Sequence, residues 1–205
     1  MTDPLLLAGL LCSRLCHDLV GPVGAVVNGV ELLTDTDEGA DEEELRDQSI
    51  ALVGESAAEL SARLRLFRLA FGAAADGSIV GHDEIADVLS PVMQGRRITV
   101  TIDGARDGLE RSVAKIGLLM ALIGADCLYR GGRMSLGFGA DGGILVRVAG
   151  DRCTLPASHA AVLAGDEADI EPRTAPIAYV LGIAAQGGRR LTCATGEAMV
   201  EFRLD

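Results

Sequence analysis

The sequence predicts an α+β protein: an N-terminal helical hairpin that forms a dimeric four-helix bundle, and a C-terminal α/β sandwich. Two observations favour this fold class. Up to about residue 71, apolar residues recur at spacings of three and four, which is typical of amphipathic helices. After residue 78, alternating strand-like segments mix with helical ones, as in a sheet covered by helices. We expect a hairpin domain over residues 1–75 and a second domain over 76–205.

The hairpin is predicted from two apolar stripes separated by a polar turn at residues 34–40. In the first helix, from Leu5 to that turn, the stripe spans about 80° of the helical wheel and consists of Cys12, Leu15, Leu19, Val23, Val26, Val30 and Leu33. The second helix, from about Glu42 to Phe71, places Val53, Leu60, Leu64, Phe67 and Phe71 on its stripe. One hairpin has too little core to fold alone. Pairing two hairpins would bury both stripes, so we expect a homodimer.

The second domain follows a linker predicted at residues 72–78. Alternation predicts strands at 98–102, 134–138, 144–148 and 200–204, and a fifth at 191–193 that pairs with the last. Helical segments fit around 83–94, 111–128 and 175–186. Together these elements predict a sheet with helices packed on one face.

Composition excludes several classes of function. The chain has 205 residues and a net charge of −12, and Lys115 is its only lysine, so it lacks the basic surface that nucleic acids require. Five scattered cysteines do not form a disulfide framework. We find neither a signal peptide nor a continuous apolar run of about 18–20 residues that would span a bilayer. A cytoplasmic protein without nucleic-acid or membrane partners is expected.

The most informative segment is His17-Asp18-Leu19-Val20-Gly21-Pro22. His17 lies about 160° from the centre of the apolar stripe, so it faces outward from the predicted bundle. On the same face, within about 40° of His17, lie Ser13, Gly21, Gly24 and Asn28. A glycine inside a helix costs about 1 kcal/mol relative to alanine, so two of them need a reason. They would leave space for another protein to approach His17.

These residue types suit phosphoryl transfer. A neutral imidazole is a good nucleophile at cytoplasmic pH, and the phosphoramidate that it forms can pass its phosphoryl group to a carboxylate. Asp18 could orient the ring or take a proton from its other nitrogen. Arg14 could help to neutralise the phosphoryl oxygens. Pro22 removes the hydrogen bond to the carbonyl of Asp18, so we expect a bend after His17.

His17-Asp18-Leu19-x-x-Pro22 resembles the phosphoacceptor box of sensor histidine kinases, and residues 13–33 are similar to the ChpT-type histidine phosphotransferases of alphaproteobacteria. The resemblance extends along nearly the whole chain. It implies that the second domain resembles a histidine-kinase ATPase domain. The weaker motifs there are Arg130-Gly131-Gly132-Arg133-Met134 and Gly187-Gly188-Arg189-Arg190-Leu191.

Two departures indicate that this domain does not bind ATP. Kinases hold Mg²⁺ through an asparagine on the first long helix of the domain, whereas the only asparagine here is Asn28. By alignment, about Ile123 occupies the position, and it cannot ligate a hard cation. The glycine-rich adenine loop is replaced by Gly150-Asp151-Arg152-Cys153-Thr154.

The resemblance therefore implies a phosphorelay histidine phosphotransferase, an enzyme with catalytic His17 and Asp18 and with no cofactor of its own. Its histidine would accept phosphate from the receiver domain of a CckA-like hybrid kinase and donate it to CtrA-like and CpdR-like response regulators, with Mg²⁺ bound on the receiver. The expected partner contacts are Ser13, Arg14, Gly21, Gly24, Asn28 and Arg65. Two alternatives remain: a histidine kinase with an atypical nucleotide site, and a non-catalytic scaffold. We expect Cys12 to be a core residue rather than a metal ligand, and assign His159 no role.

Overall fold

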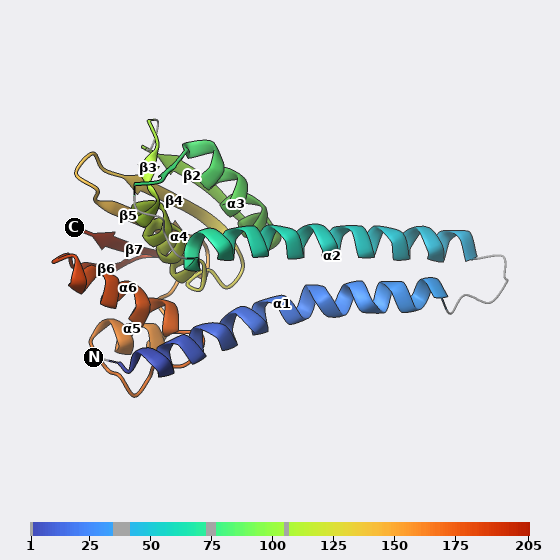
Figure 1. Ribbon diagram of the computed structural model, residues 1–205, viewed down its shortest axis with the longest axis horizontal. Coiled ribbons are helices and arrows are strands. Elements are labelled where there is room, and N and C mark those ends of the chain that lie inside the picture. The colour runs from blue at the N-terminus through green and yellow to red at the C-terminus, as the bar shows by residue number, and fades with distance from the viewer. Residues whose placement is uncertain (1, 35–41, 73–76, 105–106) are drawn as a thin grey trace.

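The computed structural model describes residues 2–34, 42–72, 77–104 and 107–205. Two long helices, α1 (Pro4–Thr34) and α2 (Glu42–Phe71), form an antiparallel pair that extends away from a mixed α/β domain (Figure 1). This confirms the α+β fold class. The predicted turn lies almost wholly outside the described residues, as do most of the linker and the boundary at 75/76.

The α/β domain is built on a five-stranded sheet with the order β2-β4-β5-β7-β6. Strands β2 and β4 are parallel, and the other neighbours are antiparallel. The sheet strands are β2 (Ile98–Asp103), β4 (Gly132–Phe138), β5 (Ile144–Ala149), β6 (Leu191–Gly196) and β7 (Met199–Leu204). The helices are α3 (His82–Gly95), α4 (Arg111–Ala125), α5 (Ala157–Leu163) and α6 (Ala175–Gln186). Two short strands, β1 (Ile79–Val80) and β3 (Leu109–Glu110), pair separately.

One face of the sheet carries the core of this domain. Alternate residues of β4 and β7 are buried, among them Met134, Leu136 and Phe202, because successive side chains of a strand point to opposite faces. Helix α4 packs on β4, β5 and β7, α3 packs on β2, and α6 contacts β6. The prediction of helices on one face is confirmed.

Some elements differ from the prediction. Helix α4 ends at Ala125 rather than at residue 128, and α5, β1 and β3 were not predicted. The Arg-Gly-Gly-Arg motif forms the entry to β4, and Gly131, just before the strand, accounts for one of its glycines. Gly131 has a φ of 83°, and a Cβ at this position would collide with the carbonyl oxygen of Arg97.

The two hairpin helices approach each other through small residues. Gly29 is buried, and a Cβ there would lie 2.6 Å from Cγ2 of Val53. Helix α1 turns Pro22 and Gly29 toward α2. The packed face overlaps the predicted stripe in part, because Leu15, Leu19, Val26 and Leu33 of that stripe are half-buried. In the single chain Val23 and Val30 are 43% and 46% exposed. Cys12 is also exposed, so its assignment to the core was wrong.

Helix α1 continues through Pro22 without interruption, and Figure 1 shows it changing direction part-way along its length. By length and composition alone α1 could cross a membrane, since its most apolar window has a mean hydropathy of 1.4. This differs from the sequence expectation. In the structure α1 packs against α2 and α6 instead.

Candidate functional site

His17 projects from α1 into solvent. Its side chain is 86% exposed, as the wheel predicted for a residue opposite the packed face. Its Nδ1 lies 3.3 Å from Oδ1 of Asp18. Within the described part of the chain, no hydrogen bond is formed by Nε2. One ring nitrogen is thus held beside a carboxylate while the other faces solvent.

The helix surface around His17 is open. A Cβ at Gly21 or Gly24 would meet nothing within 4 Å, and Ser13 and Asn28 are exposed on the same helix. The structure therefore brings these predicted residues onto the face that carries His17. Arg65 is exposed on α2.

Asp18 connects His17 to the rest of the protein. Its side chain is only 20% exposed, and its Oδ2 accepts a hydrogen bond of 2.9 Å from Nε of Arg14, one helical turn earlier. The two oxygens of this carboxylate thus serve different partners, because Oδ1 faces the imidazole.

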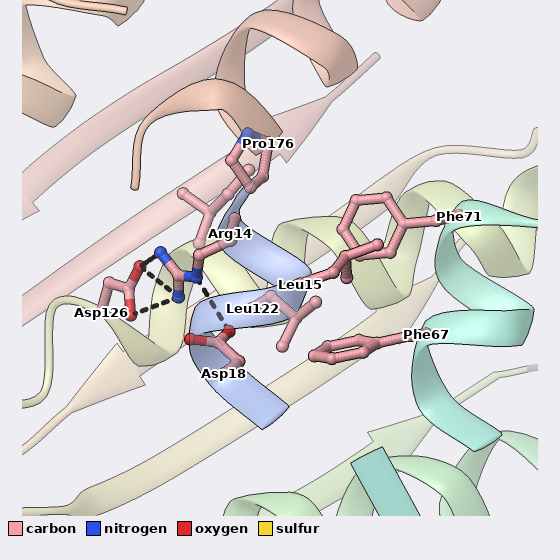
Figure 2. A pocket seen from close by; sticks show the side chains of 9 residues that line it. Arg14, Leu15, Asp18, Phe67, Phe71, Leu122, Asp126 and Pro176 are labelled. Atoms are coloured by element: carbon pink, nitrogen blue, oxygen red, sulfur yellow. Dashed lines mark hydrogen bonds and ion pairs between the residues drawn. The ribbon is translucent and has the colours of Figure 1, made fainter. Parts of the chain in front are cut away.

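The structure places Arg14 differently from the prediction that it contacts a partner. Its side chain is 14% exposed, and Nη1 and Nη2 donate to Oδ2 of Asp126, each at 3.2 Å. Figure 2 shows its guanidinium between the carboxylates of Asp18 and Asp126. A buried carboxylate needs a cation, and Arg14 supplies one. Its donors bind acceptors within the protein, so they are not available to a phosphoryl group.

Asp126 follows the last turn of α4 and is 6% exposed. Arg96 also donates to it, with Nη2 2.9 Å from Oδ1, and Nε2 of the fully buried His159 lies 3.7 Å from Oδ2. Burial alone would raise the pKa of Asp126, but the nearby His159, Arg14 and Arg96 together hold that pKa well below its usual range. Asp126 therefore remains ionised at neutral pH. Sequence analysis missed this cluster because its members are far apart in the chain.

A second arginine supports the backbone of the site. Pro22 has no N–H to donate to the carbonyl of Asp18, and Nη1 of Arg63 on α2 donates to that oxygen at 3.0 Å. Arg63 also bonds Glu59 on its own helix. Pro22 removes the usual amide donor of the Asp18 carbonyl, but no sequence pattern identifies Arg63 as its replacement.

This arrangement predicts that the effects of Pro22 and Arg63 on stability are coupled. Arg63→Met should lower the free energy of unfolding by about 1–3 kcal/mol, because it leaves a partly buried carbonyl unpaired. In a Pro22→Ala background the restored amide replaces the lost donor, so the same substitution should cost less. Urea unfolding of the four proteins at equal concentration measures the coupling. Strictly additive losses would contradict the assignment.

The other reactive groups of the described chain do not form a second site. No cluster of three or more His, Cys, Asp or Glu side chains there could hold a metal ion. Burial raises the pKa of the Cys127 thiol to about 12 and that of Cys193 to about 11, which leaves both unreactive at neutral pH. Ile123, which the resemblance places at about the position of the kinase asparagine, is 2% exposed within α4.

Residues 82–199 match the family model of the histidine phosphotransferase C-terminal domain. The protein phosphotransferase ChpT of Brucella abortus (strain 2308) is 33% identical over 201 residues, which cover 95% of this chain and 93% of that protein. The chain belongs to the histidine phosphotransferase family. A solved structure of a bacterial phosphotransferase also matches, with a TM-score of 0.84 and 28% identity over 100% of this chain and 98% of that one.

Membership establishes the general activity of this histidine phosphotransferase. It is a phosphorelay protein that transfers phosphoryl groups, and the kinase and scaffold alternatives are not favoured. The matched region begins at the first residue of α3 and ends at the first residue of β7, so it covers most of the α/β domain.

Proposed function

We propose that this histidine phosphotransferase carries the phosphoryl group on Nε2 of His17. The observation that supports this most strongly is the 86% exposed imidazole with Nδ1 next to a carboxylate. A proton on Nδ1, shared with Asp18, leaves the lone pair on Nε2. The exposed nitrogen is then the nucleophile.

Each transfer is a displacement at phosphorus. The Nε2 lone pair attacks the phosphorus of an aspartyl phosphate on the donor receiver domain, and the P–O bond to that aspartate breaks. The aspartate leaves as a carboxylate with the bonding electrons, and an N–P bond forms. The ring then carries positive charge, which Asp18 stabilises through Nδ1–H. The second transfer is the reverse process, with the carboxylate of an acceptor aspartate as the nucleophile.

His82 shows why an adjacent aspartate is not sufficient. Its Nδ1 also lies 3.3 Å from a neighbouring carboxylate oxygen, that of Asp83. However, its Nε2 lies 3.3 Å from the carbonyl oxygen of Ile102, so this nitrogen must carry the proton to form a hydrogen bond. Its side chain is 37% exposed, less than half the value for His17. His82 therefore lacks an accessible lone pair on Nε2.

The proposed partners are receiver domains: a CckA-like hybrid kinase as donor, and CtrA-like and CpdR-like regulators as acceptors, in the cytoplasm. The Mg²⁺ for each transfer would be bound by the receiver. The open face with Ser13, Gly21, Gly24 and Asn28 supports receiver docking, and exposed Arg65 offers a basic contact. We also propose that the α/β domain does not bind ATP, since a buried isoleucine stands where kinases use asparagine.

A homodimer is proposed from an exposed seam on α1. The seam consists of Val20, Val23, Val27 and Val30, which are 67%, 43%, 49% and 46% exposed. Their spacing of three, four and three is the heptad pattern of a helix that packs against another helix. On α2, Ile50 and Leu64 are 51% and 49% exposed and lie fourteen positions, or two heptads, apart. A second copy of the hairpin would bury these side chains in a four-helix bundle.

Val27→Glu should convert the dimer into a monomer, because a charge in the seam would have to be desolvated on association. Size-exclusion chromatography with light scattering reports the mass directly. Ile79→Glu is the matched control, since Ile79 is 61% exposed but lies outside the helices. A monomeric wild type, or a dimeric Val27→Glu protein, would refute the seam as the interface.

The proposed function is tested by incubating the protein with a radiolabelled, phosphorylated receiver domain and Mg²⁺. Label that is labile to acid and stable to alkali would identify phosphohistidine. Label acquired from ATP alone would instead favour the kinase alternative. Failure of every CckA-like receiver to transfer label would contradict the proposed donor.

A further inference from the structure

A chain of polar contacts connects the α/β domain to His17. It runs from Asp126 through Arg14 to Asp18 and ends at Nδ1 of the imidazole. Asp126 is 112 positions from Arg14 in the sequence, so the two sides of this contact belong to different parts of the fold.

We propose that Asp126 is a positioning residue for phosphoryl transfer, which acts through Arg14 to hold Asp18 in the orientation that engages Nδ1 of His17. The proposal rests on the assignment of His17 as the phosphoacceptor. Asp126 itself is 6% exposed, so it has no direct contact with a partner protein.

The geometry of Arg14 explains how the effect is transmitted. A free arginine side chain has many rotamers, and ordering one costs up to about 2 kcal/mol. Here Nη1 and Nη2 both bond the Asp126 carboxylate, and Nη1 also donates to the carbonyl of Arg173 at 3.3 Å. These bonds fix the plane of the guanidinium. Its remaining donor, Nε, then points at Oδ2 of Asp18 at 2.9 Å.

The consequence for Asp18 is that its two oxygens are no longer equivalent. Arg14 holds Oδ2, so Oδ1 is the oxygen available to His17, at 3.3 Å. A fixed acceptor at Nδ1 selects the tautomer that has its lone pair on Nε2. Without Asp126, Arg14 would lose its anchor, and Asp18 could rotate away from the ring.

The anchor is itself held firmly from its own domain. Arg96 donates to Oδ1 of Asp126 at 2.9 Å and to the carbonyl of Ala125 at 3.2 Å, which keeps the carboxylate in place independently of Arg14. Arg173 adds a further positive charge, with Nε 4.0 Å from Oδ2. The α/β domain thus provides a pre-formed anion onto which α1 docks.

The test compares Asp126→Asn with Arg14→Gln, their double variant and the conservative Asp126→Glu. Glu201→Gln is the matched control, because it removes a carboxylate from the Arg147 ion pair on the opposite face of the sheet. Two readouts are needed: single-turnover transfer from a phosphorylated receiver, and the ring ¹⁵N shifts of His17, which report the tautomer. Circular dichroism shows which variants are folded.

We expect Asp126→Asn to lower the transfer rate by about tenfold or more, as removal of an orienting partner commonly does, and to lower the fraction of the Nδ1–H tautomer. The receiver concentration at half-maximal rate should stay unchanged. Arg14→Gln should reproduce both effects and the double variant should add nothing, because both residues act in one chain. Asp126→Glu should partly restore the rate, and Glu201→Gln should match wild type.

Wild-type transfer and wild-type ¹⁵N shifts in folded Asp126→Asn would overturn the inference. If Asp126→Asn does not fold, wild-type transfer and wild-type ¹⁵N shifts in Arg14→Gln would overturn the inference. The two hypotheses fail differently: label on a His17→Ala protein would refute the assignment of His17, whereas normal transfer in these variants with no label on His17→Ala would refute only the role of Asp126.

Discussion

His17→Ala should abolish acceptance of the phosphoryl group while leaving the fold and its stability unchanged. The imidazole is 86% exposed, and its one polar partner among the described residues is the neighbouring Asp18, so its removal leaves neither a cavity nor a buried unpaired group. Surface substitutions of this kind change stability by less than about 0.5 kcal/mol. Loss of activity would therefore report the chemistry.

The measurement is transfer of radiolabel from a phosphorylated receiver, made on wild type, His17→Ala and His82→Ala. His82 is the matched control because it has the same histidine–aspartate geometry, at 3.3 Å, with its Nε2 engaged by a carbonyl. We expect label on wild type and on His82→Ala only. Alkali-stable label on His17→Ala would show that another residue is the phosphoacceptor.

Gly21→Leu should slow transfer by about tenfold or more, equivalent to about 1.4 kcal/mol of activation free energy, without loss of stability. Gly21 lies four positions after His17, and helical side chains lean toward the N-terminus, so a leucine there would lie over the imidazole. Apart from its two chain neighbours and the nearby helix backbone, a Cβ at Gly21 meets nothing within 4 Å, so the added group collides with no other part of the described protein. Leucine favours a helix by several tenths of a kcal/mol over glycine, but Pro22 crowds a side chain at the preceding position, so the stability should change little.

This steric prediction separates obstruction from helix stabilisation. Gly21→Ala places the same Cβ next to Pro22 and should have little effect on transfer, since a methyl group reaches less far than a leucine side chain. Gly54→Leu on α2 is the control, because a Cβ there also meets nothing within 4 Å. Wild-type transfer in Gly21→Leu would show that partners approach His17 from another direction.

Most of the fold could be predicted from periodicity. The helices α1 and α2 and the strands of the main sheet are long enough for a period of 3.6 or 2 to be visible. The two-residue strands β1 and β3 and the seven-residue α5 are too short to show one. The packed face of α1 overlaps the predicted stripe only in part, because hydrophobicity does not reveal that Gly29 allows a close approach to Val53 of α2.

The candidate site was predictable where it is local. His17, Asp18 and the glycines lie within eight positions, and their shared face follows from helix geometry. The tertiary contacts of Asp18 were not, because Arg63 reaches its carbonyl from α2, and Asp126, which follows α4, is connected to its carboxylate only through Arg14. The sequence therefore predicts Arg14 at a partner's phosphoryl group, whereas its side chain is 14% exposed and bonded to Asp18 and Asp126. His159 was set aside, yet it is fully buried beside Asp126.

Two of the contacts between α1 and α2 also limit how the hairpin can move. Arg63 binds the carbonyl of Asp18, which Pro22 leaves without an amide donor. Gly29, eleven positions after Asp18 and about 16 Å further along α1, leaves room for Val53 of α2. Sliding of one helix past the other by a turn would break both contacts together. The hairpin should therefore present His17 in a single pose to donor and acceptor alike. The two receivers would then compete for one docking position, and the relay would follow ping-pong kinetics with no ternary complex.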